Sequence, residues 1–303
     1  MTSKLGHNIG VVIPTCGMRP ELWETIDSVL QAKSKSGLEE IIICVNAGAK
    51  SSEVASAISN RVGSAVRIVI VSETVQLPMF ENWNFCISQV KSPYVHLLHD
   101  DDKVSPYFYD GIGGLIEEHP QGVLYSSATM AFGEGYEYHS GFSCNGVWTD
   151  ATAYLKKRNA FFCPSVIICR AAFSGFETRW NAVGDWKAWH DLACKGPVVC
   201  SLEPLAYYRM HQKNATTALE RSGENVREVR ELLELLQVNS IEKNYRFAAD
   251  IGYGAAVRAA AKGDWHTSIL QLVLAGNVYW SFKTVARCGW LLLKCGVRKA
   301  NWP

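Results

Sequence analysis

Short apolar runs alternate with segments of helical periodicity through the first two hundred residues. Apolar side chains dominate four runs that have the length and composition of buried strands, at residues 9–13, 40–45, 66–71 and 94–98. Between these runs, apolar residues recur every three or four positions, which is the spacing of an amphipathic helix. This alternation predicts an α/β fold with a mostly parallel, doubly wound sheet and helices on both faces. Such sheets bind ligands beyond the carboxyl ends of their strands.

The regular alternation of strand-like and helix-like segments ends after residue 122. The elements expected from there are strands at residues 122–130, 164–170 and 198–210, a helix at residues 184–195, and a loop with a hairpin at residues 132–150. Beyond residue 214 the apolar residues repeat only at helical spacing. We therefore expect one domain over residues 1–215 and a helical C-terminal region over residues 216–303.

Composition narrows the class of protein. Of the 303 residues, 48% are hydrophobic and 19% are charged, which is typical of a globular chain and not of a disordered one. The formal net charge is +1, so no overall field favours nucleic acid, and we expect no nucleic-acid partner. The ten cysteines lack the paired spacing of a zinc site, which predicts free thiols. Free thiols and the lack of a secretory pattern favour a cytoplasmic protein.

Charge is unevenly distributed near the C-terminus. No acidic residue follows Asp264, whereas five cations do, namely Lys283, Arg287, Lys294, Arg298 and Lys299. Residues 265–282 carry no charged side chain, but polar residues interrupt them, so they are too polar and too short for a confident membrane-spanning helix. Two interpretations stay open. The segment is a helix on the anionic inner face of a membrane, or it packs on the body or on a second copy of the chain.

Three adjacent carboxylates, Asp100, Asp101 and Asp102, follow directly after the apolar run at residues 94–98. Acids this close repel one another unless a cation or a helix N-terminus compensates them. Oxygen ligands at the mouth of a sheet suit Mg²⁺ or Mn²⁺, which share their coordination sphere with water and substrate phosphates. The triplet therefore points to a metal and a phosphorylated ligand. The alternative is a solvated acidic turn that caps a helix beginning near Pro106.

Five ordered segments carry a resemblance to a known family. They are residues 11–15 (VVIPT), 28–30 (SVL), the turn at Asn46, 81–84 (ENWN) and 97–102 (LLHDDD). In this order and spacing they resemble a family 2 glycosyltransferase of the GT-A fold over residues 8–215. The resemblance implies nucleotide-sugar binding by Pro14, Thr15, Arg19, Asn46, Trp83, Asn84, Asp100 and Asp101. For Arg19 the alternative is a solvated surface charge.

The same resemblance implies a metal site and a residue that recognises the nucleobase. Asp102 is the first choice as metal ligand, with Asp100 sharing metal contacts. His211, in the closing segment YYRMHQKN, is expected to hold the metal or the leaving phosphates. Asn46 stands where many relatives carry Asp, and its amide can still donate to and accept from a uracil or thymine edge.

Asp185 resembles the acidic residue that opens the acceptor-side helix of this family. An inverting transfer needs one carboxylate to take the proton of the acceptor hydroxyl, so the resemblance assigns Asp185 as general base. A helix cap is the alternative for Asp185, and Asp191, one and a half turns further along the helix, is the spare candidate for the base. Trp186 and Trp189 are expected to form a platform for the acceptor, with core packing as the alternative for each.

The resemblance implies an inverting, Mn²⁺- or Mg²⁺-dependent glycosyltransferase. Its expected substrates are a UDP- or dTDP-linked sugar and a hydroxyl of a glycan or lipid-linked glycan, in bacterial surface polysaccharide assembly. One alternative is a sugar nucleotidyltransferase, but residues 14–20 contain only Gly17 instead of a glycine-rich triphosphate loop. The other is a catalytically silent relative that binds a nucleotide or a glycan.

Overall fold

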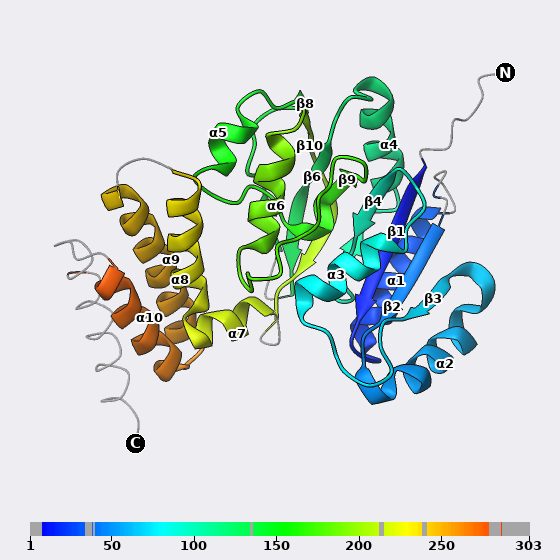
Figure 1. Cartoon of the computed structure of the whole chain (residues 1–303), viewed down its shortest axis with the longest axis horizontal. Helices are drawn as coiled ribbons and strands as arrows, with labels where there is room; N and C mark the ends of the chain where they lie inside the picture. The colour runs from blue at the N-terminus through cyan, green and yellow to red at the C-terminus, as the bar shows by residue number, and fades with distance from the viewer. Residues whose placement is uncertain are drawn as a thin grey trace. The chain divides into compact units, whose positions relative to one another are not determined.

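The structure is a computed structural model, and it describes residues 8–33, 38, 40–133, 136–211, 215–237, 241–278 and 286. The chain divides into two compact units. The first unit comprises Met1–Arg179 and Gly184–His211, and the second comprises Trp180–Val183 and Gln212–Pro303. Figure 1 traces the elements of both units along the chain.

The first unit is built on one mixed sheet. Its strands are β1 (Ile9–Thr15), β2 (Glu40–Val45), β3 (Arg67–Ile70), β4 (Tyr94–Leu97), β5 (Lys103–Val104), β6 (Leu124–Phe132), β7 (Tyr136–His139), β8 (Gly146–Val147), β9 (Val166–Cys169) and β10 (Val198–Arg209). The strand order is β3-β2-β1-β4-β9-β6-β10-β5, with β7 paired to β6 and β8 paired to β10.

The sheet is parallel only in its first part. Strands β3, β2, β1 and β4 run parallel, as the alternating pattern predicts. Strand β9 then pairs antiparallel with both β4 and β6, while β6 and β10 are parallel again. This change from parallel to mixed pairing begins where the alternation of strand-like and helix-like segments in the sequence becomes irregular. Strand β6 is followed by the antiparallel strand β7 and not by a crossover helix.

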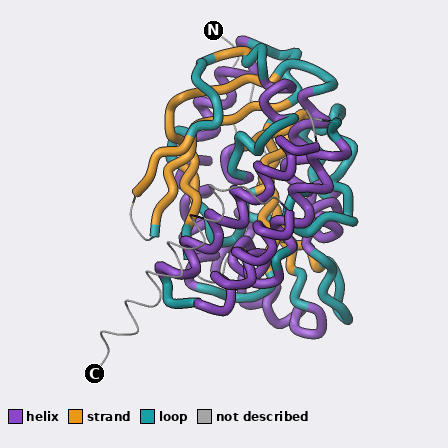
Figure 2. The backbone as a smooth tube through the Cα atoms, turned by 90° about the vertical axis from the view of Figure 1, so that its left-hand side faces the viewer, coloured by secondary structure: helices purple, strands orange, loops and turns teal. Residues whose placement is uncertain are grey.

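Helices accompany the sheet in the first unit. They are α1 (Pro20–Lys33), α2 (Ser51–Val62), α3 (Met79–Ser88), α4 (Phe108–Glu118), α5 (Ala151–Leu155) and α6 (Gly184–Ala193), with short 3-10 turns at Gly48–Lys50, Gly63–Ala65 and Cys163–Ser165. Val11 and Ile13 of β1 belong to one core with α1, α2 and α4. Val12 points to the other face, because side chains alternate along a strand. Strand β1 is consequently buried along its whole length. Figure 2 shows the strands and helices from a second side.

Within the described residues, the regular elements of the second unit are all helices. Its helices are α7 (Ala215–Ser222), α8 (Glu224–Leu235), α9 (Ile241–Ala261) and α10 (Trp265–Val278). Small residues let α9 and α10 approach closely, since a Cβ on Gly252 would lie 3.2 Å from the Cβ of Ala275. Among the helices within the described ranges, none combines the length and apolar character that crossing a bilayer requires.

A buried histidine links strand β4 to two other parts of the first unit. His96 is fully buried, with Nδ1 3.0 Å from the Tyr109 hydroxyl and Nε2 3.0 Å from the Pro164 carbonyl oxygen. Nε2–H must donate to the carbonyl, so Nδ1 accepts from the tyrosine and the ring is neutral. Burial lowers the pKa of His96 to about 3, although the bond to Pro164 acts in the opposite direction.

This histidine predicts a loss of stability in acid. The unfolded chain protonates His96 near its ordinary pKa of 6.5, whereas the folded chain does not do so until pH falls to about 3. Between these values the unfolded state binds one more proton, so the free energy of unfolding falls by about 1.4 kcal/mol per pH unit as pH decreases. Urea unfolding from pH 7 to pH 4.5 should show a shallower pH dependence for His96→Gln than for the wild type. His139→Gln, at a half-exposed histidine, is the control. Equal slopes in wild type and His96→Gln would contradict the assignment.

Candidate active site

The candidate site lies where three parallel strands end together. Strand β1 pairs with β2 on one side and with β4 on the other, with Thr15 opposite Val45 and Val12 opposite Leu97. The carboxyl ends of these strands therefore meet at one edge of the sheet. The Asp triplet follows β4 at this edge, and Thr15 and Asn46 come at the ends of β1 and β2.

Asp100 is held by the last residue of β1 and by the segment that follows this strand. The Thr15 hydroxyl donates to Asp100 Oδ2 at 2.6 Å, and the Arg19 guanidinium forms an ion pair with Asp100 Oδ1. Asp100 is nearly buried, and both of its carboxylate oxygens are engaged by protein groups. The three predicted donor-binding residues of this group are thus brought together, and Asp100 serves as the anchor of Arg19.

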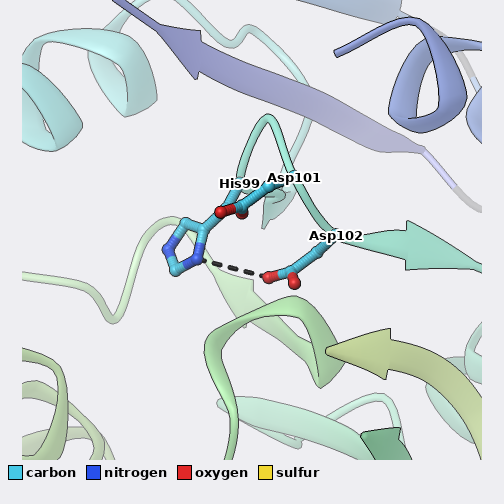
Figure 3. Close-up of side chains that lie close together, drawn as sticks. All are labelled: His99, Asp101 and Asp102. Atoms are coloured by element: carbon cyan, nitrogen blue, oxygen red, sulfur yellow. Dashed lines mark ion pairs between the residues drawn. The ribbon is translucent and has the colours of Figure 1, made fainter. Parts of the chain in front are cut away.

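Asp102 is the buried member of the triplet. Its Oδ1 accepts a 2.8 Å hydrogen bond from the Arg209 backbone N–H, and its own carbonyl oxygen accepts one of 2.7 Å from the Thr25 hydroxyl. Asp102 Oδ2 faces His99 Nδ1 at 3.3 Å (Figure 3). Within the described residues, neither Asp102 Oδ2 nor His99 Nε2 has a hydrogen-bond partner. Buried polar atoms left in this way are costly, unless a ligand completes them.

His99, Asp101 and Asp102 form a cluster that could hold a metal ion. One ligand atom from each lies within 4.8 Å of the others, and Figure 3 shows the three side chains on one turn. Asp101 Oδ2 also lies 3.0 Å from His211 Nε2, and its carbonyl oxygen accepts a 2.7 Å bond from Arg209 Nε. An imidazole and two carboxylates suit Mn²⁺, and the orphaned atoms of His99 and Asp102 fit the need for further ligands. The residues present therefore fit a divalent cation.

Burial dominates the electrostatics of Asp102. It raises the pKa of Asp102 to about 6, while His99 acts to lower that pKa and Asp101 acts to raise it. A buried carboxylate beside a second acid is expensive to keep ionised. A cation at this position would remove most of that cost.

Trp83 and Asn84, both predicted to bind the donor, support neighbouring parts of the site. The Trp83 ring is buried and stacks on the His99 imidazole, with ring centroids 4.8 Å apart. Asn84 donates from Nδ2 to the Phe176 carbonyl oxygen at 2.8 Å and accepts at Oδ1 from the Phe176 N–H at 2.7 Å. Trp83 thereby fixes the orientation of His99, and Asn84 fixes the loop at Phe176.

Asn46 and Pro14 are also buried. The Asn46 amide donates to the Leu77 carbonyl oxygen at 3.0 Å and accepts from the Leu77 N–H at 2.8 Å. These two bonds tie the end of β2 to the segment before α3. In the structure the Asn46 amide therefore contacts backbone, and its expected contact with a nucleobase stays a prediction.

Asp185 lies in the first turn of α6. Its Oδ1 accepts the Trp186 N–H at 2.6 Å and its Oδ2 accepts the Asn159 amide at 3.2 Å. Burial raises the pKa of Asp185, although these hydrogen bonds and the charge of His99 oppose the rise. Helix α6 begins at a glycine because a Cβ on Gly184 would lie 2.5 Å from the Phe80 ring. A raised pKa makes the carboxylate a better proton acceptor.

Trp186 and Trp189 lie in the interior of the first unit. They are 4% and 2% exposed, respectively. Trp186 donates from Nε1 to the Leu155 carbonyl oxygen at 2.5 Å, and Trp189 packs edge-on against Phe176. Both rings therefore pack in the interior, which is the alternative to a platform for the acceptor.

Sequence reasoning did not assign a role to three residues that shape this site, namely His99, Asn159 and Thr25. The sequence does contain a signal for His99, because this residue directly precedes the Asp triplet and a histidine can bind a metal together with carboxylates. Asn159 and Thr25 had no signal that sequence alone could supply, since Thr25 meets Asp102 across 77 positions.

Comparison with known proteins identifies the family. The family model described as glycosyl transferase family 2 matches residues 10–180, which is more than half of the chain. The chain belongs to this family and is a glycosyltransferase. A search of curated proteins returned no match.

Solved structures show the same fold. Residues 1–349 of TarS from S. aureus, in complex with UDP-GlcNAc, share 11% identity with a TM-score of 0.58, over 89% of this chain and 91% of that one. The mannosyltransferase PcManGT from Pyrobaculum calidifontis, in complex with GDP-Man and Mn²⁺, shares 13% identity with a TM-score of 0.52, over 97% and 81%. A longer TarS chain shares 13% identity with a TM-score of 0.57 over 81% of this chain, but only 43% of that longer chain is covered. These likenesses establish the GT-A fold.

Proposed function

We propose that the protein is an inverting, metal-dependent glycosyltransferase that moves a sugar from a UDP- or dTDP-linked donor to a hydroxyl of a glycan or lipid-linked glycan, in bacterial surface polysaccharide assembly. The observation that carries the proposal is the cluster of His99, Asp101 and Asp102 at the carboxyl ends of the parallel strands. The similar structures with UDP-GlcNAc and with GDP-Man and Mn²⁺ support a nucleotide-sugar donor.

His99, Asp101 and Asp102 are proposed to hold Mn²⁺ or Mg²⁺. The cation would offset the charge that develops on the leaving diphosphate. This ligand set differs from the expected set of Asp102, Asp100 and His211. In the structure Asp100 bonds to Thr15 and Arg19, and His211 meets the cluster through Asp101.

The chain's own residues supply the rest of the chemistry. Arg19 is half-exposed beside Asp100, so it can pair with a donor phosphate while its position stays fixed. Asp185 accepts the proton of the acceptor hydroxyl. The hydroxyl oxygen forms a bond to the anomeric carbon on the face opposite the diphosphate, and the bond between that carbon and the diphosphate breaks, which inverts the configuration.

Replacement of Asp185 by Asn tests the enzyme assignment. Asp185→Asn keeps the shape of the side chain but cannot take a proton, so turnover should fall by about 100-fold or more while nucleotide binding survives. Release of UDP from UDP-GlcNAc and of GDP from GDP-Man, each with Mn²⁺, measures turnover, and thermal shift with UDP measures binding.

Asp191→Asn is the matched control, because Asp191 lies on the same helix and pairs with Lys187 at 2.5 Å. It should retain wild-type turnover. Measurable turnover that is unchanged in Asp185→Asn would instead favour another base, and a lack of turnover in the wild type would favour a catalytically silent relative.

We also propose that helix α10 contacts an anionic membrane surface on the cytoplasmic side. The helix buries the polar side chains Thr267, Ser268 and Gln271, whereas Ile269 and Val273 are 53% and 52% exposed. The five cations expected to favour an anionic surface follow in residues 279–303, outside the described residues. An apolar stripe next to a basic segment is the usual pattern of a helix at an interface.

Co-sedimentation with vesicles tests this contact. The wild type should sediment more with vesicles rich in phosphatidylglycerol than with phosphatidylcholine vesicles, and Ile269→Ser with Val273→Ser should weaken the difference several-fold. Val75→Ser, at an exposed apolar residue of the first unit, should not. Equal sedimentation with both vesicles would contradict the proposal. A fall in the mass of the particle on serine substitution would assign the stripe to a homo-oligomer instead.

A further inference from the structure

The four residues immediately before α6 do not belong to the first unit. Trp180–Val183 group with the helical second unit, and the chain then returns to the first unit at Gly184. The next residue is Asp185, the proposed base. The backbone at residues 181–183 therefore sets where helix α6 begins.

One carboxylate collects the backbone N–H groups of this short segment. Glu228 of α8 is 2% exposed. The Asn181 N–H lies 2.9 Å from Oε1 and 3.0 Å from Oε2, and Oε2 also accepts the Ala182 N–H at 2.7 Å and the Val183 N–H at 3.3 Å. All of these contacts lie within the second unit.

The contacts of Glu228 are those of an anchor. Within the described part of the chain Glu228 forms no ion pair, so its buried charge is compensated by these backbone donors. Hydrogen bonds to an ionised acceptor are stronger than neutral ones, and three successive N–H groups that converge on one carboxylate hold the backbone in a single conformation.

The proposed base is then fixed from two directions. On its side-chain end, the Asp185 carboxylate accepts from Trp186 and Asn159. On its backbone end, Gly184 packs against the Phe80 ring and leads directly into the anchored segment. A shift of about 1 Å in a reacting group can cost roughly 100-fold in rate, so the position of this backbone matters for proton transfer.

We propose that Glu228 is a positioning residue for Asp185, which ties the helical second unit to catalysis. This role rests on the proposed function of Asp185. In this role Glu228 acts through the backbone at residues 181–183.

Kinetics of matched variants test the proposal. Glu228→Gln keeps the volume of the side chain but replaces one acceptor oxygen with a donor, so kcat for release of UDP or GDP from UDP-GlcNAc or GDP-Man with Mn²⁺ should fall about tenfold. KM for the donor should change less than twofold, and Glu228→Asp should lie between Gln and wild type. Glu220→Gln is the control, because Glu220 is a buried acid of the same unit that pairs with Arg258. It should keep kcat within twofold even if it lowers the melting temperature.

A double variant separates this proposal from the proposed function. Asp185→Asn with Glu228→Gln should be no slower than Asp185→Asn alone, because the anchor has no base left to position. If the double variant lost the product of the two single reductions in kcat, the positioning role would be overturned. Wild-type turnover in Asp185→Asn would overturn the base itself, whereas a slow Asp185→Asn with Glu228→Gln behaving like Glu220→Gln would overturn only the inference.

Hydrogen exchange gives a readout that needs no substrate. Amides of residues 181–187 should exchange faster in Glu228→Gln than in wild type or Glu220→Gln. Unchanged exchange at these amides would show that Glu228 does not order the segment, and the proposal would fall.

Discussion

The burial of the Asp102 carboxylate at the end of β4 is the constraint on which the site depends. An ionised carboxylate without water is stable only if other groups surround it with compensating charge or hydrogen bonds. Helix α1 supplies the Thr25 hydroxyl to its backbone, and strand β10 supplies the Arg209 N–H to its side chain. Elements far apart in the sequence are thereby drawn to one turn, which leaves one oxygen of Asp102 facing His99.

The three adjacent acids have different partners because the chain turns at the triplet. Asp100 faces Thr15 at the end of β1 and Arg19 beyond it, Asp101 faces His211 after β10, and Asp102 is fully buried. The donor side, the candidate cation and the closing segment of β10 therefore share one short loop. Asp185 is electrostatically coupled to the same place, because the charge of His99 acts on its pKa. Substitution of any one of these residues should therefore change the position or the pKa of its neighbours.

Much of this arrangement could be predicted from the sequence, and the remainder depends on long-range packing. The spacing of apolar runs predicts β1 to β4 and α3, and the ordered motifs predict the family, which the family model confirms. Local pattern could not show that β9 enters the sheet antiparallel, since direction depends on its neighbours β4 and β6. It also could not assign a separate partner to each acid, nor place Trp186 inside the unit, because alternation and motif do not distinguish an exposed indole from a buried one.

The central claim is that His99, Asp101 and Asp102 seat a divalent cation. Anomalous diffraction from crystals grown with Mn²⁺ and UDP tests it most directly, because the manganese signal locates the ion without reference to the protein. The account predicts one strong peak within bonding distance of all three side chains, and its loss in Asp102→Asn. A crystal that contains bound UDP but shows no manganese at these residues, or shows it elsewhere, would contradict the account.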